Sequence, residues 1–173
     1  MTENGVVTAS TDAGMLALWC ASTFDRITDY DTWESELYDR LDAAISGGEL
    51  VPINIGSDGA YGVRIAVAPD VLSERESRHA WLTSDPYLLV VTGEEAALSG
   101  IEHVGDPEAA TARVPLAAGR YQVRVTVVDW DQDPESVGSD GRPTANALPD
   151  FVVQVVPESG RQSYRASRRR STR

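Results

Sequence analysis

The stretch Arg120-Tyr-Gln-Val-Arg-Val-Thr-Val-Val128 decides the fold, because polar and apolar residues alternate along it. In an extended chain, successive side chains point to opposite faces, so this stretch has one apolar face and one polar face. The apolar face consists of Tyr121, Val123, Val125 and Val127. A period of two is typical of a strand in a sheet that is buried on one side and solvated on the other.

Shorter apolar runs on both sides of this stretch predict further strands. These runs are 15–20, 50–55, 61–67, 80–83, 87–91 and 151–156. The turn cluster Gly56-Ser-Asp-Gly59 predicts a hairpin between the second and third runs. Pro52 cannot donate a backbone hydrogen bond, so it predicts that its strand lies at an edge or a bulge.

The segment from Thr32 to Ser46 has a helical period instead, with apolar residues every three or four positions. The apolar stripe consists of Trp33, Leu37, Leu41, Ala44 and Ile45. Asp31 and Glu34 resemble a capping box at its start, and Gly47-Gly48 predicts its end. One helix among short strands, without βαβ alternation, favours a mainly β (α+β) fold. We expect an antiparallel β-sandwich or open barrel with one packed amphipathic helix.

Charge divides the chain into two parts. The 173 residues, 42% of them hydrophobic, suit a single domain, which we assign to residues 1–157. The chain has 27 acidic and 15 basic residues, and every basic residue is Arg. Residues 158–173 carry a formal charge of +5, whereas the rest carries −17. With so few apolar residues, the tail 158–173 is predicted to be disordered.

This charge distribution restricts the partners. Nucleic-acid affinity depends on Lys and Arg neutralising phosphates, so the acidic body is not expected to bind nucleic acid. The Arg-rich tail is compatible with nucleic acid, with the acidic body of a neighbouring copy, or with no role at all. Cys20 has no disulfide partner and is expected to be a buried thiol. No basic leader and no membrane-length apolar run are present, so we expect a cytoplasmic protein without membrane association.

Catalytic motifs are absent from the sequence. There is no phosphate-binding Gly-rich loop with a Lys, and no G-x-S-x-G nucleophile motif. Glu102-His103 is compatible with an acid–base pair, but the simpler interpretation is a solvated Glu102 and a His103 in a turn. We therefore expect a protein that is not an enzyme and has no organic cofactor.

The loop from Asp129 to Asp140 imitates a calcium-binding loop. Asp129, Asp131 and Asp133 occupy alternate positions, and Asp140 follows where the last ligand of such a loop would stand. Pro134 replaces the glycine that the sharp turn requires, because its φ angle is locked at negative values. The alternatives are a Ca²⁺ site formed by the four aspartates and a solvated acidic loop.

The same loop offers a surface for a partner. Asp29 and Asp31 add negative charge from the helical region, and together with Asp129, Asp131 and Asp133 they predict one acidic face for a basic protein. Trp130, between two of these aspartates, is a further candidate contact. An exposed tryptophan also stacks on sugars, so a calcium- or carbohydrate-binding module is the alternative function.

Two segments carry a family resemblance. Leu98-Ser-Gly-Ile-Glu-His103 and Val114-Pro-Leu-Ala-Ala-Gly-Arg-Tyr-Gln-Val-Arg-Val125 resemble small uncharacterised bacterial β-rich proteins with the same Pro-x-x-x-Gly-x-Tyr strand entry. More distantly, they are similar to the competence-protein-J type of nuclease inhibitor. The resemblance implies a β-sandwich-like fold and a non-enzymatic inhibitory or immunity role. We therefore expect an acidic module that binds a basic nuclease or toxin.

Overall fold

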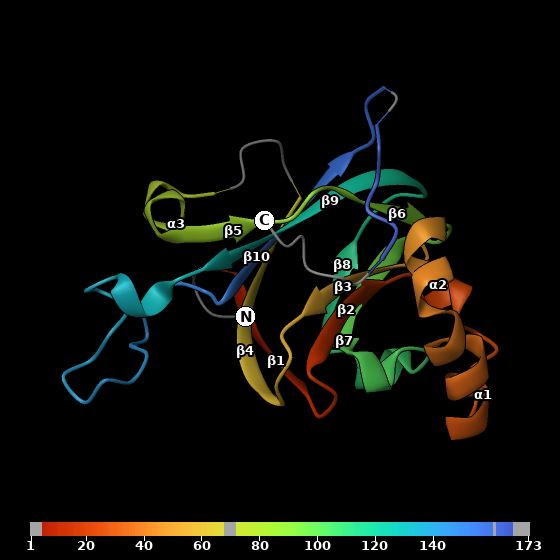
Figure 1. Ribbon diagram of the computed structural model, residues 1–173, viewed down its shortest axis with the longest axis horizontal. Coiled ribbons are helices and arrows are strands. Elements are labelled where there is room, and N and C mark those ends of the chain that lie inside the picture. Colours follow the sequence, from red (N-terminus) through yellow and green to blue (C-terminus); the bar gives the residue numbers. More distant parts are fainter. Residues whose placement is uncertain (1–4, 68–71, 161, 168–173) are drawn as a thin grey trace.

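The computed structural model describes residues 5–67, 72–160 and 162–167. Within these residues the chain forms two open sheets that share one hydrophobic core (Figure 1). The larger sheet contains β1 (Val6–Thr11), β4 (Gly59–Ala66), β5 (Ala80–Thr83), β6 (Tyr87–Val91), β9 (Gly119–Val128) and β10 (Phe151–Pro157). The smaller sheet contains β2 (Met15–Trp19), β3 (Leu50–Asn54), β7 (Glu95–Gly100) and β8 (Ala112–Pro115).

The predicted fold class, a mainly β α+β fold, is confirmed, and the sheets are open rather than closed into a barrel. The strand order is β1-β4-β10-β9-β5 in the larger sheet, with β6 also paired to β9, and β3-β2-β7-β8 in the smaller. One pair departs from the antiparallel expectation, because β10 runs parallel to β4. Pro52 lies on β3, an edge strand, as its missing N–H predicts.

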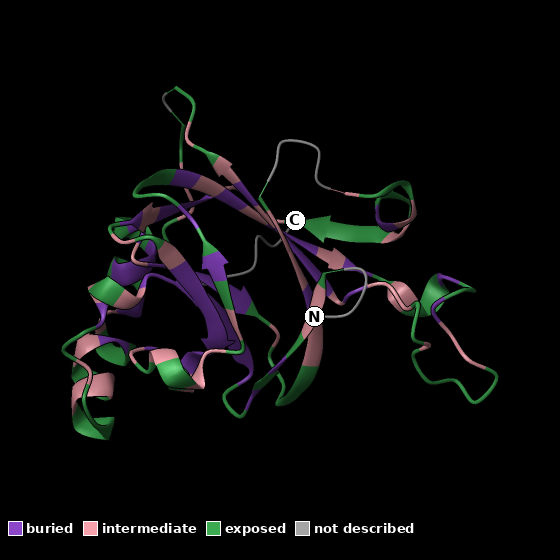
Figure 2. Cartoon of the chain, turned by 180° about the vertical axis from the view of Figure 1, so that it is seen from behind, coloured by how far each residue is buried: buried purple, intermediate pink, exposed green. Residues whose placement is uncertain are grey.

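The core lies between the sheets. Figure 2 shows the buried residues concentrated on the strands, whereas α1 (Tyr30–Glu36) is half-buried or exposed along its length. On β9 the predicted apolar face is covered, with Val123 fully buried. Thr126 is fully buried as well, although the alternation puts it on the polar face, because β5 pairs with β9 there and the Thr83 and Thr126 hydroxyls are 2.9 Å apart. Cys20 is buried, as expected.

The predicted hairpin across residues 56–59 is wrong. β3 pairs with β2 in the smaller sheet, whereas β4 pairs with β1 in the larger sheet, so the chain crosses between sheets instead of folding back. The β1–β2 connection crosses in the same place, and the Gly14 carbonyl accepts hydrogen bonds from the backbone N–H groups of Ile55 and Gly56. A Gly-rich turn looks the same in sequence whether the next strand pairs with the previous one or with the opposite sheet.

The helical region is also different from the prediction. Three pieces replace one helix: α1, the 3₁₀ turn η2 (Tyr38–Arg40) and α2 (Leu41–Gly47). The cap is Asp29 rather than Asp31, since its carboxylate accepts the Thr32 N–H at 2.9 Å while the Thr32 hydroxyl accepts the Asp29 N–H. The predicted end is confirmed, because Gly48 adopts a left-handed φ of 76° as the C-cap.

The helices differ in how they are stabilised, α2 by burial in the core and α3 by a cap at its start. Leu41, Ala44 and Ile45 of α2 are buried and belong to the common core. A third helix, α3 (Glu74–His79), begins with a capping box in which the Ser73 hydroxyl accepts the N–H of residue 76. None of the helices in the described part of the chain is both long and apolar enough to cross a membrane.

In the described part of the basic tail, Glu158 and Arg165 contact the body. Glu158 accepts hydrogen bonds from Arg120, at 2.5 Å, and from the Tyr164 hydroxyl, at 2.7 Å. The Arg165 guanidinium lies 5.4 Å from the centre of the Tyr87 ring. These contacts are polar and cation–π interactions rather than apolar burial. Arg161 and residues 168–173 lie outside the described residues.

Candidate functional site

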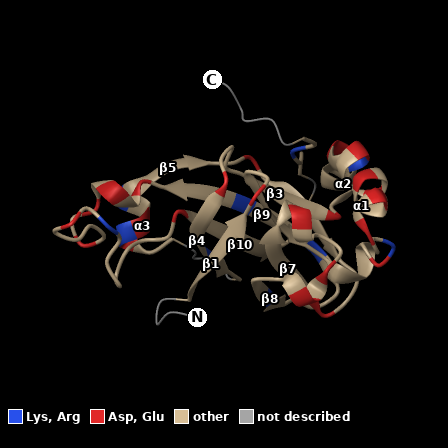
Figure 3. Ribbon diagram, turned by 90° about the horizontal axis from the view of Figure 1, so that it is seen from below, with Lys and Arg blue, Asp and Glu red and all other residues tan. Residues whose placement is uncertain are grey.

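The predicted acidic residues do not form one face. Figure 1 places α1, with Asp29 and Asp31, at one end of the long axis, and the loop that follows β9, with Asp129, at the other end. In Figure 3, ribbon segments coloured for Asp and Glu lie at both of these ends. The two groups must therefore be considered as separate sites.

At the β9 end, the carboxylate of Asp133 is already bound by neighbouring side chains of the same chain. It is buried, and its carboxylate is bound by the Arg75 guanidinium of α3 and by the Ser136 hydroxyl, which is 2.6 Å away. The Arg75 guanidinium, with help from Ser136, lowers the pKa of Asp133 to about 2. Asp133 therefore anchors this loop to α3 and is not exposed to a partner.

The remaining residues of this loop do not form the predicted calcium site. Among the residues that the structure describes, no group of three or more His, Cys, Asp or Glu side chains is placed to hold a metal ion. A hydrogen bond with Asp131 raises the pKa of Asp129. Asp140 instead accepts the backbone N–H of Arg142 at 3.1 Å. Asp129, Asp131, Asp133 and Asp140 are thus not gathered around one point in the described structure.

Trp130 is a half-buried side chain in the 3₁₀ turn η5 (Trp130–Gln132). Its Nε1–H donates to Asp150 Oδ1 at 2.9 Å, which ties this turn to the start of β10. Trp81 on β5 is the more exposed tryptophan, at 68%. Trp130 thus presents a half-buried, hydrogen-bonded ring rather than a fully accessible one for stacking on a sugar.

Glu102 and His103 do not form an acid–base pair. They lie in the 3₁₀ turn η3 (Ile101–His103), and no hydrogen bond between them is present in the described residues. Glu102 accepts the Thr11 hydroxyl at 3.0 Å and the Asp12 N–H at 2.8 Å, so it is not simply solvated, while His103 is exposed. This turn instead forms part of a pocket at the α1 end.

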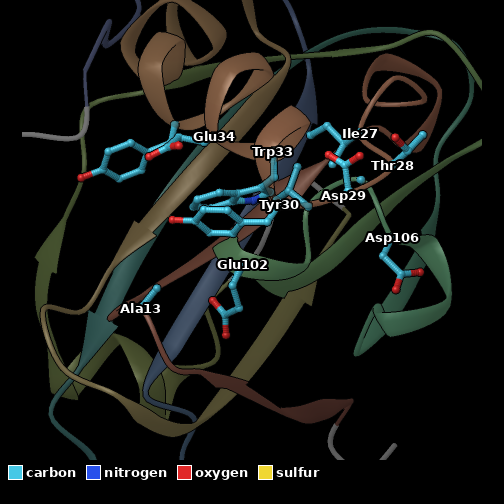
Figure 4. A pocket seen from close by; sticks show the side chains of 12 residues that line it. Ala13, Ile27, Thr28, Asp29, Tyr30, Trp33, Glu34, Glu102 and Asp106 are labelled. Atoms are coloured by element: carbon cyan, nitrogen blue, oxygen red, sulfur yellow. The ribbon is translucent and has the colours of Figure 1, made fainter.

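The pocket at the α1 end has a volume of about 900 Å³ and lies between α1 and the turn η3 (Figure 4). We call it the aromatic pocket. Its lining residues are Ala13, Ile27, Thr28, Asp29, Tyr30, Trp33, Glu34, Tyr38, Glu102, Val104, Gly105 and Asp106. It thus combines aromatic rings and carboxylates from residues 27–38 with further carboxylates from residues 102–106.

Three stacked aromatic rings form one wall of the aromatic pocket. The Tyr30 and Trp33 ring centres are 5.9 Å apart, those of Trp33 and Tyr38 are 5.8 Å apart, and both pairs are close to parallel. Residues five apart do not meet on a regular α-helix, so the break after α1 is what brings Tyr38 onto Trp33. The Trp33 Nε1–H donates to the Ile101 carbonyl at 3.0 Å and fixes this wall against η3.

Four carboxylates surround these rings, from Asp29, Glu34, Glu102 and Asp106. Glu102 is oriented by its two hydrogen bonds to the β1–β2 connection. Asp106 caps a short turn, accepting the Glu108 N–H at 3.1 Å. The Thr32 backbone and side-chain hydrogen bonds lower the pKa of Asp29, which keeps it ionised. Asp31 does not line the pocket.

In the part of the chain that the structure describes, no basic side chain pairs with these four carboxylates. The lining contains no Arg or His, and within the described residues none of the four carboxylates forms an ion pair. Several arginines elsewhere are paired with acids, for example Arg40 with Glu49 and Arg64 with Glu76. Uncompensated charge beside accessible aromatic rings gives a negative potential that attracts cations.

Of the residues that line the aromatic pocket, only Asp29 is predicted from the sequence as a contact for a partner protein. The sequence places Trp33 on the apolar stripe of the predicted helix and offers Glu102 only as half of an acid–base pair. The missed signal is the density of Tyr and Trp among acidic residues over 29–38. An ordinary core helix does not need exposed tyrosines, yet Tyr30 is 69% and Tyr38 54% exposed.

No protein-family model matches the sequence, and a search of curated proteins found no match. Among solved structures, the chain is similar to one named Crocagin biosynthetic gene J. The TM-score is 0.59 over 89% of this chain and 95% of that chain. The two sequences are 19% identical, so the similarity concerns the fold alone.

Proposed function

We propose that this protein is a non-enzymatic, cytoplasmic binding module that captures a basic protein, such as a nuclease or toxin, through the aromatic pocket. The observation that carries the proposal is the set of four uncompensated carboxylates around three stacked rings. Carboxylates steer a basic partner toward the surface, and exposed aromatic rings supply contact area at a low entropic cost.

The position of the pocket supports this proposal. Tyr30 and Tyr38 are among the most exposed large hydrophobic residues of the described chain, and exposed tyrosines are enriched where proteins bind each other. The wall behind them is fixed, because Trp33 is hydrogen-bonded to η3 and Leu37 is fully buried. A rigid site loses little conformational freedom on binding.

The resemblance to the competence-protein-J type of nuclease inhibitor agrees with such a role. Inhibition requires a surface that complements the basic, phosphate-binding face of a nuclease, and the net charge of −17 outside the tail provides the corresponding sign. On this proposal, the cationic site of the partner binds in the aromatic pocket and is thereby blocked.

Site-specific photo-crosslinking tests the proposal. A photoreactive residue in place of Tyr30 is expected to crosslink to a basic protein in a lysate of the source cells, and the full chain should then inhibit that purified protein at one-to-one stoichiometry. The same residue in place of Trp81, which is equally exposed but outside the pocket, is the control. Identical crosslinked proteins at both positions, or a partner that the chain does not inhibit, would contradict the proposal.

A further inference from the structure

We infer that the group which enters the aromatic pocket is an arginine side chain of the basic partner, and that the pocket discriminates against lysine. This inference rests on the proposed function and adds the chemistry of recognition to it. The structural basis is the combination of flat exposed rings with an oriented carboxylate. A guanidinium matches them by stacking and by bidentate hydrogen bonding, whereas an ammonium offers its charge but neither of these contacts.

The first match is stacking. A guanidinium is planar and weakly hydrated, so it lies flat on an aromatic face while its N–H groups still point outward in the plane. Tyr30 and Tyr38 keep more than half of their surface exposed, so their rings are available for this contact. The chain itself shows the same chemistry elsewhere, where the Arg165 guanidinium lies over the ring of Tyr87.

The second match is the carboxylate of Glu102. Each of its oxygens accepts one hydrogen bond, from the Thr11 hydroxyl and from the Asp12 N–H, and these two bonds fix its plane. A carboxylate has about four acceptor positions, so each oxygen retains one. A fixed pair of acceptors suits the parallel N–H groups of arginine, which bind a carboxylate in a bidentate manner.

The charges and the size of the pocket fit a side chain presented by a protein segment. Asp29, Glu34 and Asp106 add negative charge without any basic neighbour in the lining. The volume of about 900 Å³ exceeds what one side chain fills, so residues flanking the arginine are also accommodated. Lysine gains the same long-range attraction but loses both stacking and bidentate binding, and its strongly hydrated ammonium keeps its water in so open a site.

Calorimetric titration of the full chain with three peptides tests the inference. The peptides are Gly-Arg-Gly-Arg-Gly, its lysine counterpart and its citrulline counterpart, which has the shape of arginine without its charge. We expect the arginine peptide to bind at least tenfold more tightly than the lysine peptide, and the citrulline peptide not to bind measurably. Tyr30→Ala and Glu102→Gln should each abolish this preference, whereas Trp81→Ala and Glu94→Gln, both outside the pocket, should retain it.

The outcomes separate the inference from the proposed function. If the arginine and lysine peptides bind equally tightly and Tyr30→Ala abolishes the binding of both, the inference of arginine selection is wrong. The proposed binding of a basic partner would then still stand. Binding of neither peptide would overturn the inference, while the crosslinking experiment decides the proposed function independently. Glu102→Gln removes hydrogen bonds to the β1–β2 connection, so Glu34→Gln at an exposed position serves as the second variant. Unchanged arginine preference in both Gln variants would contradict the role of the carboxylates.

Discussion

The floor of the aromatic pocket depends on a glycine, and replacing it gives a prediction with a defined magnitude. Gly105 adopts a φ of +98°, and a Cβ at this position would lie 2.6 Å from Ile27 Cβ, which is closer than real Cβ contacts. Gly105→Ala therefore combines backbone strain, about 1–2 kcal/mol for a left-handed residue, with overpacking of about 1–3 kcal/mol. The expected loss of unfolding free energy is the sum, roughly 2–5 kcal/mol.

Gly141→Ala is the matched control. Gly141 also has a positive φ, +76°, but a Cβ there meets nothing within 4 Å, so only the strain of about 1–2 kcal/mol is expected. Urea unfolding followed by circular dichroism measures both variants. Because Ile27 also lines the pocket, Gly105→Ala should in addition weaken peptide binding. A Gly105→Ala variant no less stable than Gly141→Ala would refute the close contact between Gly105 and Ile27.

Three further predictions concern other charged groups. Glu76→Gln should lower the free energy of unfolding by about 2–3 kcal/mol, because buried Glu76 binds Arg64 and the Ser73 N–H. The control Glu74→Gln, at an exposed position, should lower it by less than about 0.5 kcal/mol. Urea unfolding measures both variants. Glu158→Gln should speed trypsin cleavage after Arg165 several-fold, measured by mass spectrometry, because the tail loses its contact with Arg120. Raising the salt concentration from about 0.1 to 1 M should weaken arginine-peptide binding in calorimetry, since the screening length falls from roughly 10 to 3 Å.

The Glu76 prediction has a pH dependence with a defined sign. Burial alone would raise the pKa of Glu76, but hydrogen bonds from Arg64 and Ser73 outweigh burial and lower the pKa below 4.5. The stabilisation is therefore present above the unfolded-state pKa of about 4.3 and is lost as the pH falls through the lower pKa of the folded state. The stability difference between wild type and Glu76→Gln should shrink in acid, and a difference that grows there would contradict the assignment.

The periodic features of the fold could be predicted from the sequence, and its long-range pairings could not. The alternation of β9 gives its buried face because the pattern is local, and Gly47-Gly48 ends the helix because the positive φ of Gly48 is also a local requirement. The partner of β4 depends instead on whether the chain crosses between sheets at residues 56–59. That choice is made by packing against β1 and β10, far away in sequence.

In the candidate site, the sequence likewise could not predict which carboxylates are paired with arginines. Asp133 looks like an exposed acid in a polar loop, but Arg75, 58 residues earlier, buries and neutralises it. Asp29 looks the same in sequence, yet no arginine reaches it in the described structure. Only the three-dimensional arrangement separates carboxylates that hold the fold together from those that remain for a partner.

Entry of a cationic side chain into the aromatic pocket can be followed at the indole N–H resonances of the chain. The four tryptophans give four indole signals in a ¹⁵N–¹H NMR spectrum. On addition of the arginine peptide, we expect the Trp33 signal to shift, because its ring stacks between Tyr30 and Tyr38 in the pocket. The signals of Trp19, Trp81 and Trp130 should not shift. A shift confined to Trp81 or Trp130, or an unchanged Trp33 signal at saturating peptide, would contradict this expectation.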